Sequence, residues 1–525
     1  MDFYISVALI GISVALAVAA SVPVLKILQL SGYRASGVIG WWKSTKYENL
    51  VRYTALTLLG AIATAVFSAC LSKFEYARYC STAAFVVFEI IFIVSVKKNG
   101  DMNVKLTARM KRLIAAVAVL TSIVGAGVAW ACYYSPYCQI VVAALGFFIP
   151  FIAMAANASM LPLERANNNR YVKKAKARLN KQKPVVIGIT GSYGKTTAKN
   201  LLFAMLSKKH SVLATPGNFN TPMGICKTVN ELLHGESVFI AELGARYKGD
   251  IKELCDIVNP EYGIITAVGD MHIATLGSRE GVANVKFELA SSVASDGLTV
   301  LNGYNADCAA LAERSAPCRL ALTGENGRAS YDDLKSNADG ASFVLTLDGE
   351  KFEVKTKLLG AHIPELVCAC AVIAVELGVD KNDIVAAVEQ MPPVEHRLQL
   401  LPQVHAGVTV IDDAYNSNPV GAKNALEVLK TFDGTRVVIT PGFVELGAIE
   451  KQCNTELGKR IAENCDHAYL IGSRAADIKG GATEGGMSED KIRIFGSRDE
   501  AVAALVDIDG PKVVLFENDL PDNIK

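Results

Sequence analysis

Five strongly apolar runs near the start of the chain constrain its folding more than any other feature. Each run is 18 to 22 residues long, and together they comprise Tyr4–Leu25, Thr54–Leu71, Tyr79–Val96, Leu113–Tyr134 and Tyr137–Ala156. A helix of that length crosses a hydrocarbon core about 30 Å thick. Buried core helices are the alternative, but five such runs in succession favour an α-helical membrane domain over residues 1–160.

The basic residues between these runs predict an orientation. Lys and Arg number four in residues 31–53, two in 72–78, six in 97–112, none in 135–136 and eight in 157–183. Positive residues gather on the cytoplasmic side of a membrane. We therefore expect a multi-pass protein of a bacterial-type cytoplasmic membrane, with its N-terminus outside and its later domains in the cytoplasm. The basic segment 161–183 is expected to act as a tether against the lipid bilayer.

Charge and cysteine content exclude several other classes. The 525 residues carry a formal net charge of +1, so the chain has no general attraction for nucleic acid. Its twelve cysteines show no spacing typical of zinc sites or disulfide scaffolds.

From residue 184 onward the pattern changes to short apolar strands that alternate with helices. Such alternation predicts an α/β protein with parallel sheets. The expected strands of the first part are Val185–Thr190, Val238–Leu243, Tyr262–Val268 and Gly297–Leu301, with helices at Thr196–Ser207 and Arg279–Ser295. A hairpin is expected to turn at Asp348–Gly349. A second α/β unit is expected from Arg397, with strands at Val408–Ile411, Arg436–Ile439, His467–Ile471 and Lys512–Phe516.

A phosphate-binding loop is the strongest local motif. An apolar strand is followed by Gly191, Ser192, Tyr193, Gly194, Lys195, Thr196 and Thr197, which lead into a helix. Glycines allow backbone N–H groups to surround a phosphate, and the helix N-terminus adds partial positive charge. Lys195 would neutralise phosphate charge and the Thr196 hydroxyl would reach Mg²⁺. The spacing departs from the strict motif, because Ile189 stands where the first glycine is usual.

Two further side chains are placed for metal chemistry. Glu242 ends one expected strand and His272 follows the next. Ligands gather at the carboxyl edge of such sheets, so both residues are candidate ligands of a phosphate-bound Mg²⁺.

These and other segments resemble the Mur ligase family of ATP-dependent amide-forming enzymes, and within it the members that add D-alanyl-D-alanine. The matching segments are Ile189–Thr197, Gly217–Ile225, Glu242–Ala245, Gly277–Ala283 with Lys286, Asp412–Pro419 and Glu445–Gly447. The resemblance implies a P-loop central domain over residues 184–396 and a Rossmann-like C-terminal domain over 397–525.

The resemblance also implies a mechanism and a set of site residues. ATP phosphorylates a carboxylate of a cell-envelope precursor, and the amine of an amino acid or dipeptide displaces the phosphate. It implies that Lys195 and Thr196 contact ATP and Mg²⁺, that Glu242, His272 and Lys286 hold metal, and that Arg397 lies near the γ-phosphate. Lys286 matches a lysine that is carbamylated in several family members. The implied nucleotide and substrate contacts of the C-terminal domain are Asp412, Asp413, Tyr415, Asn416 and Asn418.

Three departures from the family pattern affect the expected substrates. His362 is followed by Ile363-Pro364-Glu365-Leu366, without the asparagine that usually lies beside the adenine. Near the end, Glu517-Asn518-Asp519 stands where a basic run is usual. Because apolar runs replace the domain that binds a UDP-sugar, we expect a membrane-proximal carboxylate substrate.

Two rival functions remain open on the sequence alone. One is a transporter driven by a P-loop ATPase. The Asp412–Pro419 segment argues against it, because an ATPase motor does not require that segment. A catalytically weak scaffold of envelope synthesis is suggested by the altered motif at His362.

Overall fold

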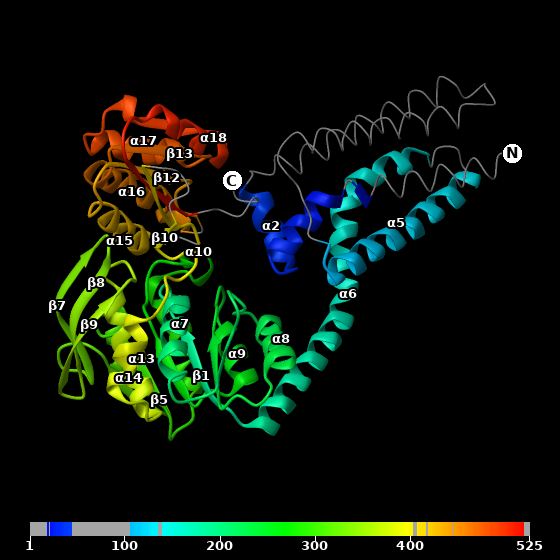
Figure 1. Cartoon of the computed structure of the whole chain (residues 1–525). Coiled ribbons are helices and arrows are strands. Elements are labelled where there is room, and N and C mark those ends of the chain that lie inside the picture. Colours follow the sequence, from blue (N-terminus) through cyan, green and yellow to red (C-terminus); the bar gives the residue numbers. More distant parts are fainter. Residues whose placement is uncertain are drawn as a thin grey trace. The chain divides into compact units, whose positions relative to one another are not determined.

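A computed structural model describes residues 18–19, 21–44, 106–134, 139–402, 407–415, 418–444 and 446–518. The chain divides into two compact units, Met1–Asn168 and Asn169–Lys525. Figure 1 shows the helical first unit and the α/β second unit. Each is described separately below.

The described part of the first unit is helical. Its labelled helices are α2 (Ala35–Ser44), α5 (Ala108–Tyr134) and the first part of α6 (Gln139–Gln182). An ion pair of 2.7 Å joins Arg112 of α5 to Glu164 of α6. Small residues such as Ala153 and Ala156 of α6 are fully buried against Val117 and Met110 of α5.

The expected multi-pass membrane localisation is wrong. Among the residues that the structure describes, no helix combines the length and apolar character that a membrane crossing requires. The last apolar run is not a helix by itself, because α6 continues through it into a long charged stretch that ends at Gln182. The runs Thr54–Leu71 and Tyr79–Val96, and most of Tyr4–Leu25, lie outside the described residues. The expected lipid partner has no support either.

The basic end of α6 packs against the second unit and caps one of its helices. Ala175 and Leu179 are buried in its core, and Arg178 donates hydrogen bonds from Nε and Nη1 to the carbonyl oxygens of Leu233 and Asn230 at 2.7 and 3.1 Å. These carbonyls belong to the last turn of a helix and the residue after it, where no intrahelical partner exists. The Arg178 guanidinium therefore caps that helix.

The first sheet of the second unit is parallel throughout, with the order β2-β3-β1-β4-β5-β6. Its strands are β1 (Val185–Thr190), β2 (Val212–Ala214), β3 (Val238–Glu242), β4 (Tyr262–Ile265), β5 (Leu298–Leu301) and β6 (Arg319–Leu322). One face is covered by α7 (Lys195–Leu206), α13 (Ile363–Glu376) and α14 (Lys381–Glu389). The other is covered by α8 (Pro222–Leu232), α9 (Asp250–Val258) and α11 (Arg279–Phe287).

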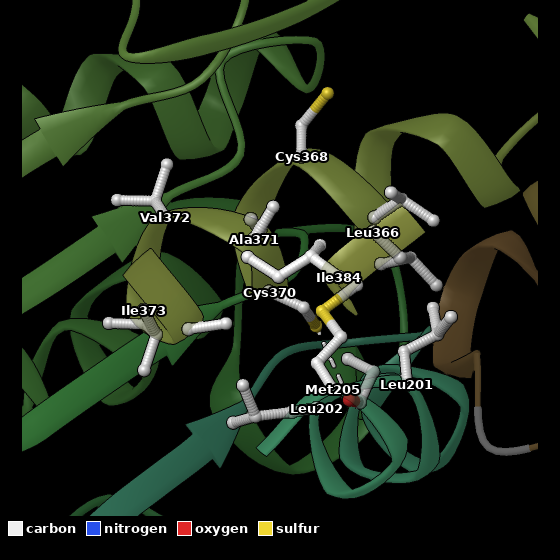
Figure 2. Packing of buried hydrophobic residues seen from close by; sticks show 14 of the residues in the cluster. Leu201, Leu202, Met205, Leu366, Cys368, Cys370, Ala371, Val372, Ile373 and Ile384 are labelled. Carbon is white, nitrogen blue, oxygen red and sulfur yellow. Dashed lines mark hydrogen bonds between the residues drawn. The ribbon is translucent and has the colours of Figure 1, made fainter. Parts of the chain in front are cut away.

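The middle of the helix α13, residues 366–374, is apolar on every side because it is buried on every side. Val367, Cys370 and Ile373 are fully inaccessible to solvent, and α13 packs on Leu201 and Leu202 of α7, as Figure 2 shows. The Cys370 thiol donates a 3.3 Å hydrogen bond to the Ala198 carbonyl. The cysteines of this helix thus serve as small core residues.

A small antiparallel sheet follows, made of β7 (Ala329–Asn337), β8 (Gly340–Leu347) and β9 (Glu350–Thr356). Its β8–β9 turn is the expected one at Asp348–Gly349, where both residues have positive φ values of 46° and 83°. A two-residue turn of this kind matches the twist of the strands that it joins.

The second large sheet has the order β10-β11-β15-β12-β13-β14, and only the β10–β11 pair is antiparallel. Its strands are β10 (Gln399–Leu401), β11 (Val408–Asp413), β12 (Thr435–Thr440), β13 (His467–Ile471), β14 (Ile492–Phe495) and β15 (Lys512–Glu517). The helices α15 (Pro419–Leu429), α16 (Glu450–Asn464) and α17 (Ala475–Glu484) cover one face. The other face carries α18 (Arg498–Ala503).

Candidate functional site

The phosphate-binding loop lies where the strand order of the first sheet reverses. β1 has β3 on one side and β4 on the other, with Ile189 paired to Glu242 and Thr190 to Ile265. A crevice forms at such a switch point, outside the carboxyl ends of the strands. The loop Gly191–Gly194 and the start of α7 occupy this position.

Glycine is required at both ends of the loop. A Cβ at Gly191, where φ is 153°, would lie 2.0 Å from Thr266 Oγ1. At Gly194 φ is 79°, a left-handed conformation that places it before the first residue of α7. Inside the loop, Ser192 Oγ accepts a 3.0 Å bond from Gly269 N–H, and the Tyr193 hydroxyl accepts one of 3.1 Å from Asn305.

Lys195 points back over the loop that precedes it. Its Nζ donates a 2.7 Å hydrogen bond to the Gly191 carbonyl. The pKa of Lys195 is lowered to about 8, chiefly by burial. The Glu242 carboxylate opposes this shift, and the charge of Arg397 contributes to it. The ammonium therefore lies in a water-poor site where an anionic phosphate would restore its charge.

Glu242 is the centre of the polar network beside the loop. Its carboxylate is 2% exposed and accepts bonds from Thr196 Oγ1 at 3.1 Å and Lys199 Nζ at 3.0 Å through Oε2. Its Oε1 accepts from Asn220 Nδ2 at 3.1 Å. Burial opposes ionisation, but Lys199 and Lys195 hold the pKa of Glu242 below its usual value. Glu242 is thus a buried, charged carboxylate in contact with the first turn of α7.

Lys286 is the second buried amine of this region. It lies in the last turn of α11, is 3% exposed, and burial lowers its pKa to about 7. The charge of Lys195 contributes to this lowering of the pKa, and the carboxylates of Asp250 and Glu288 oppose it. Burial thus favours the neutral amine of Lys286, which is the form of an amine that reacts with carbon dioxide.

His272 is placed at the same edge but outside the Glu242 network. It precedes the four-residue helix α10 (Ile273–Leu276) in a left-handed conformation, with φ at 63°. Within the described ranges, no three His, Cys, Asp or Glu side chains gather into a metal site. Of the expected metal residues, the structure joins Thr196 and Glu242 directly. A cation held there would draw its remaining ligands from phosphate and water, as Mg²⁺ commonly does.

A solvent-open cleft runs from the loop to the second sheet. Gly194 and Thr196 line one side, and Arg397 and Asp413 line the other. Arg397 Nη1 donates a 2.6 Å bond to the Tyr415 carbonyl, and its guanidinium lies 4.4 Å from the centre of the Tyr415 ring. Burial lowers the pKa of Arg397, opposed first by the nearby Asp413 carboxylate.

The expected residues of the second α/β unit have structural partners here. Asp412 Oδ2 lies 2.7 Å from His396 Nδ1, and Asp413 Oδ1 accepts a 3.1 Å bond from Leu398 N–H. Burial raises the pKa of Asp413. The Asn418 side chain caps α15, accepting bonds from the N–H groups of the second and third residues of the helix at 3.2 and 3.0 Å.

Two of these residues, Asp413 and Asn418, line the cleft. Burial raises the pKa of Tyr415, and a hydrogen bond with the Asn218 side chain opposes the shift. Asn416, which was expected to bind nucleotide or substrate, lies outside the described residues.

Sequence reasoning missed two members of the network around Glu242. Lys199 lies one turn after Lys195 on α7 and also donates a 2.5 Å bond to the Gly217 carbonyl. Asn220 belongs to the Gly217–Ile225 segment. That segment resembles the family, but the resemblance predicted no function for any of its residues. The spacing of two lysines by four residues on one helix was the available signal.

Comparisons with known proteins cover both α/β parts of the chain. The Mur ligase middle domain family matches residues 189–374, and the Mur ligase glutamate ligase domain family matches residues 396–517.

Curated relatives are named UDP-N-acetylmuramoyl-tripeptide–D-alanyl-D-alanine ligase. The protein from Bacillus subtilis is 28% identical over 63% of this chain and 72% of its own length. That from Synechocystis is 30% identical over 61% of this chain and 68% of its own length. The Mycobacterium bovis protein is 36% identical over 46% of this chain, and the matched region spans only 48% of that relative.

A solved structure shares the fold. The crystal structure of the MurF ligase from Thermotoga maritima in complex with ADP superposes with a TM-score of 0.59 at 26% identity. The match covers 67% of this chain and 80% of that one.

Proposed function

Since the chain belongs to the Mur ligase family, we propose that it joins a carboxylate of a peptidoglycan-type precursor to an amine, with ATP as the energy source. The names of its relatives suggest a UDP-N-acetylmuramoyl peptide as the carboxylate substrate and D-alanyl-D-alanine as the amine. Membrane proximity of the substrate rested on the localisation that the structure contradicts, and it is not part of the proposal.

The observation that carries the proposal is the Glu242 network beside the phosphate-binding loop. The charges of Lys199 and Lys195, together with hydrogen bonds from Lys199 and Asn220, keep the pKa of this buried carboxylate below its usual value. The Thr196 hydroxyl also donates a hydrogen bond to it. Buried charges in proteins are paired or coordinate metal ions, and Glu242, already paired with Lys199, also contacts the Thr196 hydroxyl beside the loop. Lys195, whose Nζ donates a hydrogen bond to the Gly191 carbonyl, is positioned to exchange that bond for a phosphate oxygen.

Two steps would account for the reaction. First, an oxygen of the substrate carboxylate attacks the γ-phosphorus of ATP, and ADP leaves. Second, the amine nitrogen attacks the acyl carbon, inorganic phosphate leaves, and the nitrogen loses its extra proton. Arg397 lines the cleft, and Lys195 lies between its lining residues Gly194 and Thr196. The two cations would stabilise the negative charge that develops on the phosphoryl oxygens.

The side chains present suit a Mg²⁺ ion bound together with ATP. Thr196 and Glu242 offer a hydroxyl and a carboxylate in direct contact, and His272 and Lys286 lie on loops or helices of the same region. The ion would neutralise phosphate charge and orient the γ-phosphoryl group. A carbamate on Lys286 would turn a buried amine into a second oxygen ligand, and the neutral amine favoured by its lowered pKa permits this modification.

We further assign ATP binding to residues 184–396 and closure over ATP and the amine to residues 397–525. The cleft between Gly194 and Arg397 supports this division, because its walls come from the two parts. A cleft of this kind would exclude water from an acyl-phosphate when it closes.

Product formation tests the proposal. Purified protein is incubated with ATP, Mg²⁺, UDP-N-acetylmuramoyl-tripeptide and D-alanyl-D-alanine, and products are identified by mass spectrometry. We expect a product that is heavier by one dipeptide less one water, and no such product from Lys195→Ala. Folded protein that forms no amide with this or related amines would instead support the rival function of a scaffold.

A further inference from the structure

A hydrogen-bonded pair of carboxyl groups lies where the strands β11 and β15 end. Asp413 and Glu517 are register partners on these neighbouring parallel strands, so their side chains leave the sheet on the same face. Two residues earlier on the same strands, Ile411 and Leu515 are buried in the core on that face. Glu517 is fully buried, whereas Asp413 lines the cleft together with Arg397. A side-chain hydrogen bond joins the two carboxyl groups.

The effect of this bond on Asp413 indicates which of the two groups carries a proton. An ionised carboxylate can only accept hydrogen bonds, so a bond between two carboxyl groups needs a proton on one of them. Burial raises the pKa of Asp413 to about 6, and the bond with Glu517 acts against that rise. The bond therefore stabilises the ionised form of Asp413. It follows that Asp413 is the acceptor and that Glu517 is the donor.

The charges around the pair also favour a proton on Glu517. The other titratable side chains around the pair and Arg397 are Asp412, His396, Tyr415 and Glu242. Of these, Asp412 is bonded to His396 and Glu242 is paired with Lys199. The Arg397 guanidinium can balance one buried carboxylate, that of Asp413. A second charge on Glu517 would have no compensation, and two carboxylates that share a site do not both ionise readily.

Asp413 holds a strained piece of backbone beside Arg397. His396 and Leu398, the residues on either side of Arg397, have φ values of 57° and 47°. This left-handed region is uncommon for residues other than glycine and is strained for a bulky side chain such as leucine. Asp413 Oδ1 accepts a 3.1 Å bond from Leu398 N–H, and Asp412 Oδ2 lies 2.7 Å from His396 Nδ1. The two aspartates thus bind the strained residues on both sides of Arg397.

The guanidinium of Arg397 is held by the same segment. Its Nη1 donates a 2.6 Å bond to the Tyr415 carbonyl, and it lies 4.4 Å from the centre of the Tyr415 ring. Tyr415 is two residues after Asp413. Residues 413–415 therefore fix both the backbone and the side chain of Arg397, and an Asp413 carboxylate that turned away would release Leu398 N–H.

We propose that Glu517 is a positioning residue, which as a protonated carboxyl group orients the Asp413 carboxylate and through it holds Arg397 in place for phosphoryl transfer. The inference rests on the proposed ligase function, from which Arg397 takes its role. Glu517 itself touches neither nucleotide nor substrate in this account. It begins the run Glu517-Asn518-Asp519 in which this chain departs from the family pattern, so the resemblance assigns no such role to it.

Substitutions at position 517 test the proposal. Glu517→Gln is uncharged, has nearly the same shape and keeps an N–H donor for Asp413, whereas Glu517→Leu has no donor. Asp466→Asn is the matched control, because Asp466 precedes β13 at the opposite edge of the same sheet and pairs there with Arg436 at 3.0 Å. Thermal melting establishes that each variant folds.

We expect Glu517→Leu to lower kcat/KM for ATP about 10- to 100-fold, because the buried Asp413 carboxylate loses a donor. Glu517→Gln should recover most of that loss, and Asp466→Asn should match the wild type. In an Arg397→Lys background Glu517→Leu should have a much smaller effect, because Glu517 acts through Arg397. A Gln variant as poor as the Leu variant would overturn the inference, as would equal losses from Glu517→Leu in both backgrounds.

Infrared spectroscopy tests the proton on Glu517 without relying on the ligase function. The difference spectrum between wild type and Glu517→Gln in neutral buffer should contain the carbonyl band of a protonated carboxyl group. The difference spectrum between wild type and Asp466→Asn should contain a carboxylate band instead. A carboxylate band for Glu517 would refute the inference, even if Glu517→Leu failed to fold.

Failure of the proposed function gives a different result. The wild type would then form no amide, while the infrared band of Glu517 would be unchanged. Calorimetric titration with ATP decides the positioning role in that case. Weaker ATP binding in Glu517→Leu than in Glu517→Gln supports that role, and equal binding in the two variants refutes it.

Discussion

Replacing Lys199 by methionine removes the ion-pair partner of Glu242 in the most buried polar network of the chain's first large sheet. The two side chains are 3% and 2% exposed and lie 3.0 Å apart. Removal of one member of such a pair destabilises a protein by about 3–5 kcal/mol, because a buried charge is left without compensation. We expect Lys199→Met and Glu242→Gln each to lower the free energy of unfolding by roughly that amount. The double variant should lose much less than the sum.

The pH dependence of this loss follows from the pKa of Glu242. In the wild type that pKa lies below the usual 4.5, so the pair stabilises the fold above about pH 4.5 and the contribution is lost on acidification. Without Lys199 the effect of burial is expected to dominate and raise the pKa. The folded variant then binds a proton more tightly than the unfolded chain, so its stability falls as pH rises. The gap between wild type and Lys199→Met should widen from pH 5 to pH 7.

Urea unfolding followed by far-UV circular dichroism measures these free energies. Lys252→Met is the control, since Lys252 forms a 3.0 Å pair with Asp256 in which both side chains are more than half exposed. Exposed pairs contribute about 0–1 kcal/mol, so the control should stay near wild type. Additive losses in the double variant, or a Lys199→Met loss that does not change with pH, would refute the reasoning.

Three further predictions concern the site. Gly191→Ala should abolish ATP binding measured by calorimetry, because the new Cβ would lie 2.0 Å from the Thr266 hydroxyl. The control is Gly480→Ala, which lies in an open helical position and should bind ATP normally. Ligase activity should fall as pH drops through about 7, because protonated Lys286 cannot form a carbamate. Added bicarbonate should raise the activity of the wild type. An equal response to bicarbonate in Lys286→Ala would exclude the carbamate. Arg397→Lys should lower kcat/KM for ATP about tenfold by losing its hydrogen bond and ring contact with Tyr415, and unchanged kinetics would remove Arg397 from the site.

The α/β part of the fold was predictable because its apolar strands are continuous and buried. The expected strand Val185–Thr190 has the observed bounds, and Tyr262–Val268 differs only at its end, where β4 stops at Ile265. β7 was missed because Ala329–Asn337 is rich in polar residues and exposed along one face. β14 was missed because Ile492–Phe495 is an edge strand of four residues with one arginine.

Family membership and ATP-dependent amide-ligase chemistry at the level of the family were also predictable, and the comparisons confirm them. That prediction rested on the order of the motifs, since the segments from Ile189 to Gly447 follow one another in the family's order across the matched regions. The membrane localisation was wrong, and for the last apolar run the structure shows that the run does not mark the end of its helix. That run merges into α6, whose second half carries the charges that bind the α/β unit.

The contacts within the site were less accessible to sequence reasoning. Glu242 and Thr196 were each assigned to metal, but their direct bond and the role of Lys199 depend on the register of β1 against β3. Asp413 and Glu517 are far apart in the sequence, and only the pairing of β11 with β15 places them side by side.

Transfer of oxygen from the carboxylate substrate to phosphate tests the central claim most directly. UDP-N-acetylmuramoyl-tripeptide labelled with ¹⁸O in its terminal carboxylate is converted with ATP and D-alanyl-D-alanine, and the released phosphate is analysed by mass spectrometry. Activation by phosphorylation predicts one ¹⁸O atom in the phosphate for each amide formed, with none released by Lys195→Ala. Amide formation with unlabelled phosphate, or ATP hydrolysis at the same rate without the carboxylate substrate, would contradict the account.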